Sequence, residues 1–359
     1  MKRSLALTTS ALFAVGTLGA QAGGFELSPL STSFMYEDGG YAEIGYSSRK
    51  YTVTDDFYAP TGSAVQDQSN TSSALKFDLN DAFSLGLSQY RQGSIQLDYS
   101  GAGSVAAAGL PAVNLDIDAL AILARYKVNE NFSVLGGLKR TTVKDAVANI
   151  FQSASLPQSN ITGTSEIGYV YGVAYQRDDI ALRVELTAET STDFELATTN
   201  DGAGGGVTTA SVPDYLNLAF QSGIAKDTLV FGSIRKANWA SNQIQVHPDP
   251  TPTSSFGDST TYNIGLGRKI NEDFSVFASY STEAAGDGNE TSLLNMTNGY
   301  EGISIGMAYS LDNTTITVGG NYTKLGDVNM STQGGGTLPP SSFSGNTVKS
   351  IGLKVAYNF

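Results

Sequence analysis

The sequence contains no cysteine, so disulfide bonds contribute nothing to its stability. Its one histidine, His247, lies in the proline-rich segment VHPDPTP without an evident Ser or Asp partner arrangement. Because hydrolytic catalysis needs a base held beside a nucleophile or an activated water, we expect no enzymatic activity. Basic residues are also scarce: 21 Lys and Arg stand against 34 Asp and Glu, and the net charge of −13 disfavours nucleic acid as a partner.

Long hydrophobic runs are absent beyond the first 22 residues. Lys2 and Arg3 precede an apolar run over about 5–15, and Ala20-Gln21-Ala22 has the small-x-small pattern of a signal peptidase site. The alternative is a short transmembrane anchor, but the run falls short of the roughly 20 residues that a spanning helix needs. We therefore expect residues 1–22 to be a cleaved export signal.

Glycine and aromatic residues are abundant, with 40 Gly, 18 Tyr and 16 Phe. This composition suits β-structure with many turns. Apolar and polar residues alternate from about residue 41 to the end, as in antiparallel strands whose two faces meet different media. The clearest apolar rows are Leu75, Phe77 and Leu79; Ile167, Tyr169, Tyr171, Val173 and Tyr175; Ile180, Leu182, Val184, Leu186 and Ala188; and Ile351, Leu353, Val355, Tyr357 and Phe359.

The connections between these rows alternate strictly between short and long. Such alternation, with an even number of strands, is typical of bacterial outer-membrane barrels. We predict an all-β fold: a transmembrane antiparallel β-barrel of about 14 strands over 41–359, with residues 23–40 as a short N-terminal plug or tether. A secreted β-sandwich or propeller is the alternative, but it would not separate its connections by length. Tight polar turns lie near 80–81, 129–131, 178–179, 226–227, 271–273 and 312–313, and long loops near 55–70, 100–112, 147–163, 198–207, 246–258, 285–297 and 331–344.

The third predicted strand, in LGLSQYRQGSIQLDYS, interrupts its own alternation. Its apolar row begins with Leu85 and Leu87 and is expected to resume at Ile95, but Gln89, Arg91 and Gly93 hold the same parity between them. An arginine in hydrocarbon near mid-membrane costs about 2–4 kcal/mol. We predict a kink at or beside Gly93 that opens the barrel wall, because glycine in a strand often marks a bulge. The alternative is that Arg91 snorkels or lies nearer an interface. The pattern also breaks between Ile117 and Leu120, a weaker candidate for a bulge.

Several segments share a cadence in which a short turn rich in Asn, Asp or Glu precedes an apolar strand: ALKFDLNDAFSLGLSQY, LARYKVNENFSVLGGLK, GVAYQRDDIALRVELTAE and VPDYLNLAFQSGIAKDTLVFGSIRKANW. With GGFELSPLSTS after the signal, this pattern resembles the FadL family of outer-membrane transporters for long-chain fatty acids and aromatic hydrocarbons. The resemblance implies fourteen strands, an N-terminal plug that here includes Phe25 and Leu27, and a kinked third strand. The family's longer plug carries an Asn-Pro-Ala element that is missing between Gly23 and Tyr41.

We predict passive uptake of hydrophobic small molecules, captured by extracellular loops and released sideways into the lipid. Val147, Ile150, Phe151 and Ala154 have helical spacing in one long loop, and Leu156, Leu293, Leu294 and Met296 add apolar surface, although these residues could equally pack the loops together. For a carboxylate head group, Arg91 and Lys139 are the candidate cations. We expect no cofactor and no metal site. Outer-membrane lipid and lipopolysaccharide are the expected surroundings, and a monomer is favoured. A polar-solute porin or a loop-based adhesion barrel is the alternative.

Overall fold

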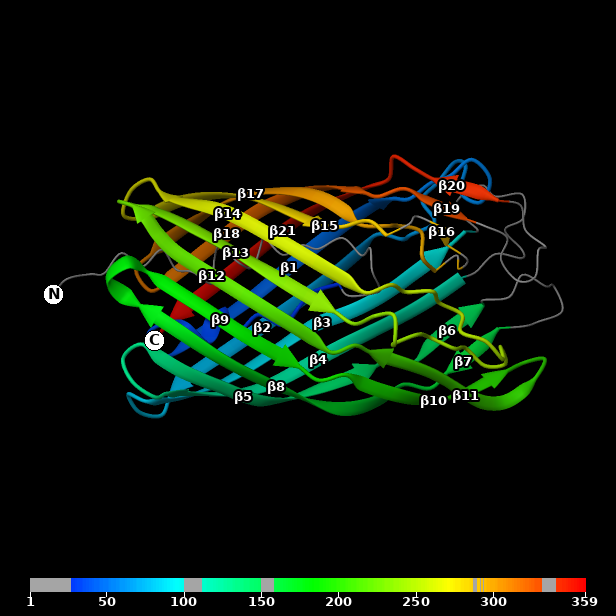
Figure 1. Cartoon of the computed structure of the whole chain (residues 1–359), viewed down its shortest axis with the longest axis horizontal. Coiled ribbons are helices and arrows are strands. Elements are labelled where there is room, and N and C mark those ends of the chain that lie inside the picture. Colours follow the sequence, from blue (N-terminus) through cyan, green and yellow to red (C-terminus); the bar gives the residue numbers. More distant parts are fainter. Residues whose placement is uncertain are drawn as a thin grey trace.

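Fourteen antiparallel strands close into a barrel, as predicted (Figure 1). The computed structural model describes residues 27–99, 112–149, 158–286, 289, 290, 292, 294–330 and 340–359. The first and last strands pair with each other and complete the circle. The barrel strands are β1 (Tyr41–Thr52), β2 (Gln68–Asp78), β3 (Phe83–Asp98), β4 (Ala112–Lys127), β5 (Phe132–Val143), β8 (Thr164–Arg177), β9 (Leu182–Glu189), β12 (Tyr215–Ala225), β13 (Thr228–Ala237), β14 (Ser259–Lys269), β15 (Phe274–Glu283), β17 (Tyr300–Leu311), β18 (Thr314–Leu325) and β21 (Thr347–Asn358).

The short turns gather at one end of the barrel and the long connections at the other (Figure 1). By analogy with outer-membrane barrels, we call these the periplasmic and the extracellular end. In the described part of the chain, no helix is long and apolar enough to cross a membrane. The described residues include two short 3-10 helices, η1 (Ser33–Tyr36) and η4 (Asp178–Ile180). The long connections contain the further strands β6 (Ala146–Asn149), β7 (Ser159–Ile161), β10 (Thr192–Asn200), β11 (Gly204–Val212), β16 (Asn289–Glu290), β19 (Val328–Met330) and β20 (Ser341–Phe343).

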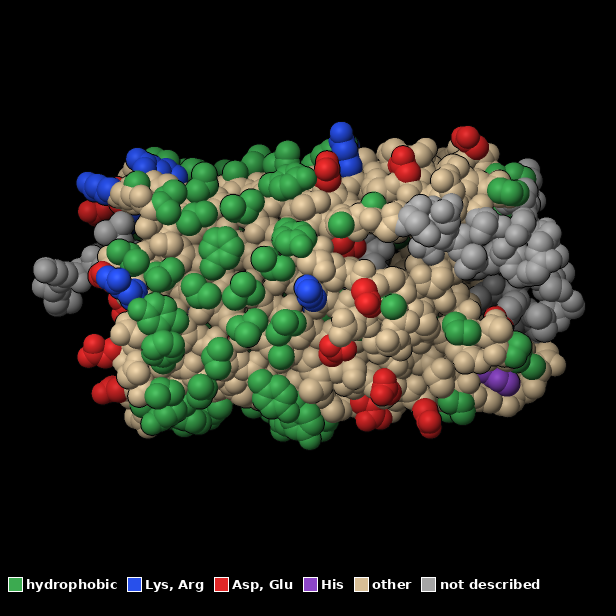
Figure 2. All heavy atoms as spheres, viewed as in Figure 1, with side chains coloured by type: hydrophobic (Ala, Val, Ile, Leu, Met, Phe, Trp, Pro, Cys, Tyr) green, Lys and Arg blue, Asp and Glu red, His purple; other side chains and the backbone are tan. Residues whose placement is uncertain are grey.

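The outer face carries an apolar belt over the periplasmic part of the wall (Figure 2). Its side chains are exposed because each strand turns alternate residues outward, and exposed apolar rows are stable only against lipid. A closed barrel with this belt is a protein of the bacterial outer membrane. The belt includes Ile44, Tyr46, Phe77, Leu85, Leu87, Leu120, Ile122, Val134, Leu138, Ile167, Tyr169, Tyr171, Val173, Val184, Leu186, Leu216, Ile234, Tyr262, Ile264, Leu266, Tyr280, Ile303, Ile305, Met307, Ile316, Val318, Tyr322, Ile351, Leu353 and Tyr357.

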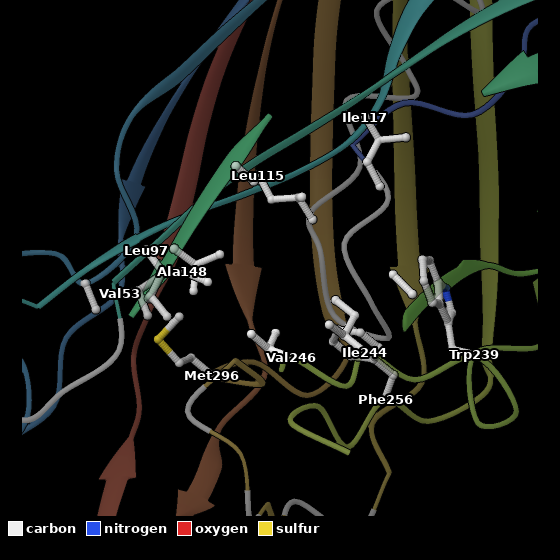
Figure 3. Packing of buried hydrophobic residues seen from close by; sticks show 14 of the residues in the cluster. Val53, Leu97, Leu115, Ile117, Ala148, Trp239, Ile244, Val246, Phe256 and Met296 are labelled. Carbon is white, nitrogen blue, oxygen red and sulfur yellow. The ribbon is translucent and has the colours of Figure 1, made fainter. Parts of the chain in front are cut away.

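The interior divides into two regions of opposite chemistry. Toward the extracellular end, strands and loops bury one apolar cluster, which we call the upper lumen (Figure 3). Toward the periplasmic end, the interior holds buried charged side chains, and we call this region the lower lumen. The upper lumen includes Tyr51, Val53, Tyr58, Leu97, Val113, Leu115, Ile117, Val143, Phe194, Tyr215, Trp239, Ile244, Val246, Phe256 and Met296. The lower lumen includes Lys76, Arg125, Lys139, Arg183, Glu185, Glu189, Arg235 and Lys354.

Strand β4 crosses both regions without interruption. Its inward residues remain in phase from Val113 and Ile117 to Arg125, and its outward row reaches the belt at Leu120. The candidate bulge between Ile117 and Leu120 is therefore wrong. The apolar pattern breaks there because the inward face is apolar at the extracellular end and the outward face is apolar at the periplasmic end.

Residues 27–40 lie inside the barrel and fill part of the lower lumen. Wall side chains hold this segment through its carbonyls: Arg125 Nη1 donates to Met35 O over 2.7 Å, and Lys76 Nζ donates to Glu37 O over 2.6 Å. Phe34 and Met35 of η1 are buried against the wall. The guanidinium groups of Arg125 and Arg183 lie 4.3 and 4.4 Å from the centre of the Tyr36 ring.

Candidate functional site: an opening in the barrel wall

Strands β2 and β3 separate in the upper part of the wall. They pair from Asp78–Ser84 to Ser73–Gln89, and beyond this point residues 68–72 of β2 pair only with β1. The chain just before β2 meets β3 again at the Val65–Leu97 bridge, in the same register. The strands therefore part locally and rejoin. We call this stretch without backbone pairing, between residues 68–72 and 90–95, the wall opening.

A β-bulge lies at the edge of this opening. Along the β3–β4 ladder, Arg91 pairs with Asp118 and Gly93 pairs with Ile117, so Gln92 is the extra residue. The bulge reverses the alternation: outward residues have odd numbers before it, whereas Ile95 and Leu97 face the upper lumen after it. The expectation that the outward row resumes at Ile95 is wrong, because an inserted residue exchanges the two faces.

Arg91 lies at the extracellular border of the apolar belt. Leu87 on β3 and Leu120 on β4 are the last outward apolar residues before it, so its expected position near mid-membrane is wrong. The alternative prediction, that Arg91 lies nearer a membrane interface, describes its position better. Arg91 Nη1 lies 2.5 Å from Asp116 Oδ1, and Arg91 Nε lies 2.5 Å from Asp118 Oδ1.

Lys144, between β5 and β6, adds a further ion pair to this group, with Nζ 2.7 Å from Asp118 Oδ2. We call Arg91, Asp116, Asp118 and Lys144 the outer clamp. The bulged part of β3 lacks backbone hydrogen bonds to β2 on one side. On its other side, the outer clamp ties it to β4 and to the end of β5. Because its two carboxylates already engage Arg91, this arginine is poorly placed to hold a ligand head group.

The N-terminal segment covers the inner side of the opening. The backbone N–H groups of Leu27 and Ser28 both donate to Gln92 O, over 2.7 and 3.3 Å. From the other side of the opening, Arg49 Nη2 donates to Leu27 O over 2.9 Å. Leu27, one of the two predicted plug residues, thus spans the opening from β1 to β3. Phe25, the other, lies outside the described residues.

Lys139 lies where the upper and lower lumen meet, and it is 0% exposed. Its Nζ lies 2.6 Å from Glu189 Oε2, and Arg235 Nη1 lies 3.2 Å from the other oxygen of that carboxylate. The Arg235 guanidinium also lies 3.9 Å from the centre of the Tyr215 ring. Two cations share one carboxylate, so the group carries a net charge of +1. The sequence singled out Lys139 but not Arg235 or Tyr215, because their proximity depends on strands far apart in the sequence.

The predicted capture residues have a mixed outcome. Val147 lies on β6 with its side chain 41% exposed, so the predicted helical stripe through it is wrong. Ile150, Phe151 and Leu156 lie outside the described residues, as do Ala154 and Leu293. Of the other loop residues named, Met296 is buried in the upper lumen and Leu294 packs against it.

The sequence reading missed the connection over 238–258. Its side chains Trp239, Ile244, Val246 and Phe256 fold into the upper lumen (Figure 3). The alternating Ile244 and Val246 were a signal that the neighbouring proline-rich stretch obscured. These residues, rather than a loop helix, supply the described apolar surface at the extracellular mouth.

No protein-family model and no curated protein matches the sequence. Solved structures do match, over nearly the whole chain. A FadL homologue from Pseudomonas aeruginosa is 15% identical with a TM-score of 0.74, and the match covers 96% of this chain and 98% of that one. The chain has the FadL-type fold.

Two toluene transporters share this fold. TbuX from Ralstonia pickettii is 11% identical with a TM-score of 0.64, and the match covers 96% of this chain and 97% of the transporter. TodX from Pseudomonas putida is 12% identical with a TM-score of 0.63, over 97% and 98% of the two chains. At these identities the similarity establishes the architecture, and function has to be argued from the residues.

Proposed function

We propose that this protein is a channel for passive uptake of hydrophobic compounds, which enter the upper lumen and leave sideways through the wall opening. The observation that carries the proposal is the position of the opening. It lies between the apolar upper lumen, at Ile95 and Ile117, and the outer surface directly above the apolar belt, at Leu87 and Leu120.

The energetics favour the lateral route over passage along the barrel axis. Apolar surface gains about 25 cal/mol for each Å² removed from water, so a solute burying about 200 Å² gains roughly 5 kcal/mol in an apolar environment. The upper lumen supplies such an environment, and so does lipid. The lower lumen does not, because buried charges such as Arg125 and Glu185 line it and residues 27–40 occupy it.

Burial in the lower lumen has a further effect on the N-terminal segment. Desolvation, reinforced by the nearby Glu185 carboxylate, raises the pKa of the Tyr36 phenol far above its ordinary value. The hydroxyl therefore stays protonated and donates to Glu185. This bond helps to hold η1 across the axial path.

The structural neighbours support this substrate class. TbuX and TodX are toluene transporters, and a further neighbour, CymD, is a monoaromatic hydrocarbon channel that is 12% identical with a TM-score of 0.60. We propose the same general activity here, transport rather than catalysis, with the choice between fatty acids and aromatic hydrocarbons left to the residues of the upper lumen.

The alternative function is a polar-solute porin, and polar groups in the interior favour it. Among the described residues, the buried hydroxyls of Ser133, Ser279 and Thr317 have no hydrogen-bond partner, as water-lined walls would show. Planar-bilayer conductance separates the two functions. Large, steady currents would support the porin, whereas we expect small currents because residues 27–40 fill the axial path.

Deletion of Gln92 tests the proposed route. Gln92 is the extra residue of the bulge, so its removal restores strict alternation: Tyr90 inward, Arg91 outward and Gly93 inward. Every other β3 side chain keeps its face, and removal of the bulge lets β3 continue its pairing with β2 beyond Ser73–Gln89. We expect the deletion variant to fold and to take up [14C]toluene or [14C]dodecane into liposomes at least about tenfold more slowly, a barrier change of roughly 1.4 kcal/mol.

A matched control deletes Ala203, in the connection between β10 and β11. This variant should take up hydrocarbon at the parent rate. Unchanged uptake after deletion of Gln92 would contradict release through the wall opening. Absence of hydrocarbon uptake by the parent protein would contradict the channel itself.

A further inference from the structure

Three lysines lie side by side on the outer face of the wall, at the extracellular border of the apolar belt. Lys50 on β1 and Lys349 on β21 are exposed and directly opposite each other in the ladder that closes the barrel. Lys324 on β18 is also exposed, and it lies diagonally across from Lys349, whose direct partner on β18 is Tyr322. The Cβ atoms of such pairs are about 5 and about 7 Å apart, so all three ammonium groups can contact one ligand. We call Lys50, Lys324 and Lys349 the lysine patch.

The lysine patch forms no ion pair with any described residue. Glu301 is directly opposite Lys324 in the β17–β18 ladder but is not paired with it, and Asp67, just before β2, accepts from the backbone N–H of Tyr51. Arg91, at the same border, engages two carboxylates instead. Like charges directly opposite each other destabilise a sheet, and this chain has 34 acidic against 21 basic residues. Three adjacent cations without compensation in an acidic protein therefore indicate an anionic ligand.

The height of the lysine patch on the wall places it in the head-group layer of the outer leaflet. Along the same outward rows, the last belt residues before it are Tyr46 on β1, Tyr322 on β18 and Ile351 on β21. Tyrosines at the end of an apolar row mark the membrane interface of a barrel. Successive outward residues are about 7 Å apart along a strand, so the lysines lie just beyond the acyl chains.

We propose that the lysine patch binds lipopolysaccharide through the phosphate groups of its lipid A. This lipid forms the outer leaflet of the bacterial outer membrane, and its phosphates lie between the acyl chains and the sugars. A phosphate group carries about 1.5 to 2 negative charges at neutral pH, and lysine binds it as a point charge with three donors. The patch thus supplies the charge that lipid A phosphates need, at the depth where they lie.

The wall directly below the lysine patch suits the acyl chains of the same lipid. Ile351 lies one outward position below Lys349, and its neighbours across the two ladders are the small residues Ser48 and Gly320. An acyl chain can therefore contact the exposed isoleucine from either side. Head group and acyl chains of one lipid A then both meet surface that fits them.

Other cations at this border are less suitable for a phosphate. The outer clamp holds two carboxylates, which repel an anion. Lys236 on β13 is exposed and outward, but its direct ladder neighbours are Leu216 and Thr260, so it offers one charge only. The lysine patch also joins the first and last strands, and a phosphate there would relieve the repulsion between Lys50 and Lys349 where the barrel closes.

The test titrates the detergent-solubilised full-length mature protein with lipid A and measures bound lipid by native mass spectrometry. Lys50→Gln with Lys349→Gln should weaken binding by about tenfold or more, because each lysine near an anionic head group adds to the affinity. Lys50→Arg with Lys349→Arg keeps both charges and should retain most of the affinity. The matched control, Lys226→Gln with Lys236→Gln, also removes two exposed cations and should bind lipid A like the parent.

Thermal unfolding gives a second measurement. Lipid A should raise the unfolding midpoint of the parent, because a ligand that binds only the folded state stabilises it, and should raise that of the double glutamine variant much less. Lys349→Gln alone keeps the test decisive where the double variant fails to fold, and it should lose part of the lipid A affinity.

Three results would overturn the site. The first is equal lipid A binding by the parent and the folded glutamine variants, and the second is equal binding of lipid A from which the phosphates have been removed. The third is displacement of lipid A by inorganic phosphate at similar concentrations, which would identify a site for the free anion. Hydrocarbon uptake takes no part in these measurements, so failure of the lysine patch leaves the proposed channel function standing.

Discussion

The upper and lower lumen are built by the same strands and differ in what their inward residues meet. On β4, Val113, Leu115 and Ile117 face other apolar side chains, and eight residues after Ile117 the inward Arg125 donates to the N-terminal segment. Burial of apolar surface stabilises the upper lumen, and this stabilisation does not depend on specific hydrogen bonds or ion pairs. The lower lumen is held by hydrogen bonds and ion pairs, and breaking an ion pair there is costly because it leaves a buried charge without its partner.

This difference explains where a hydrophobic solute can stop and where it cannot pass. An apolar molecule can replace part of the upper cluster without leaving a polar atom unpaired. In the lower lumen it would separate charged pairs such as Lys139 and Glu189. The wall opening lies where the upper lumen ends, so on the proposed route the change in chemistry directs the solute sideways.

The largest loss of stability is expected when the buried ion pair of the lower lumen is broken. Glu189→Leu leaves Lys139 and Arg235 buried without an acidic partner, and we expect the free energy of unfolding to fall by about 3–5 kcal/mol. Denaturant unfolding of the barrel in lipid vesicles measures this change. The control Glu130→Leu lies in an exposed turn and should cost little. A loss below about 1 kcal/mol for Glu189→Leu would show that the pair is solvated.

An intermediate effect is expected when polarity is introduced into the upper lumen. Ile117→Asn places an amide without a partner beside the bulge, opposite Gly93, and should lower the free energy of unfolding by about 2–3 kcal/mol. It should also slow hydrocarbon uptake, because the solute loses apolar contact at the inner mouth. Asn114→Ala, on the outward face of the same strand, is the control. Hydrocarbon uptake equal to that of the parent would mean that the solute does not pass Ile117.

The smallest effect is expected at the outer clamp, which water reaches. Arg91→Gln removes two partly exposed ion pairs, and the free energy of unfolding should fall by only about 0.5–1 kcal/mol. Exchange of the charges, Arg91→Asp with Asp118→Arg, should recover part of this loss. A loss of several kcal/mol would place Arg91 in a dry environment, as the sequence had suggested.

The sequence could predict what depends on short-range pattern. Outward residues in the periplasmic part of the wall meet lipid, so alternation revealed the belt, and turn residues revealed the two kinds of connection. It also drew attention to residues 89–93 as irregular. The sequence could not reveal that the alternation reverses at Gln92. Leu87 faces lipid and Leu97 faces the upper lumen, but both are leucines.

The charged partners were also beyond sequence reasoning. Whether a lysine or arginine has an acidic neighbour depends on register between strands that are distant in the chain, as Lys139 and Glu189 show. Arg49 was not singled out because nothing in its local sequence marks it. Its partners, Leu27 and Asn70, become known only once the barrel is closed.

Reversible closure of the wall opening tests the lateral route most directly. The chain has no cysteine, so Asn70→Cys with Gln92→Cys places one thiol on each edge of the gap. The free double variant should take up dodecane near the parent rate. Bridging the thiols with a cleavable cross-linker should reduce uptake to that of empty liposomes, and cleavage should restore it. Undiminished uptake through the bridged barrel would contradict sideways release.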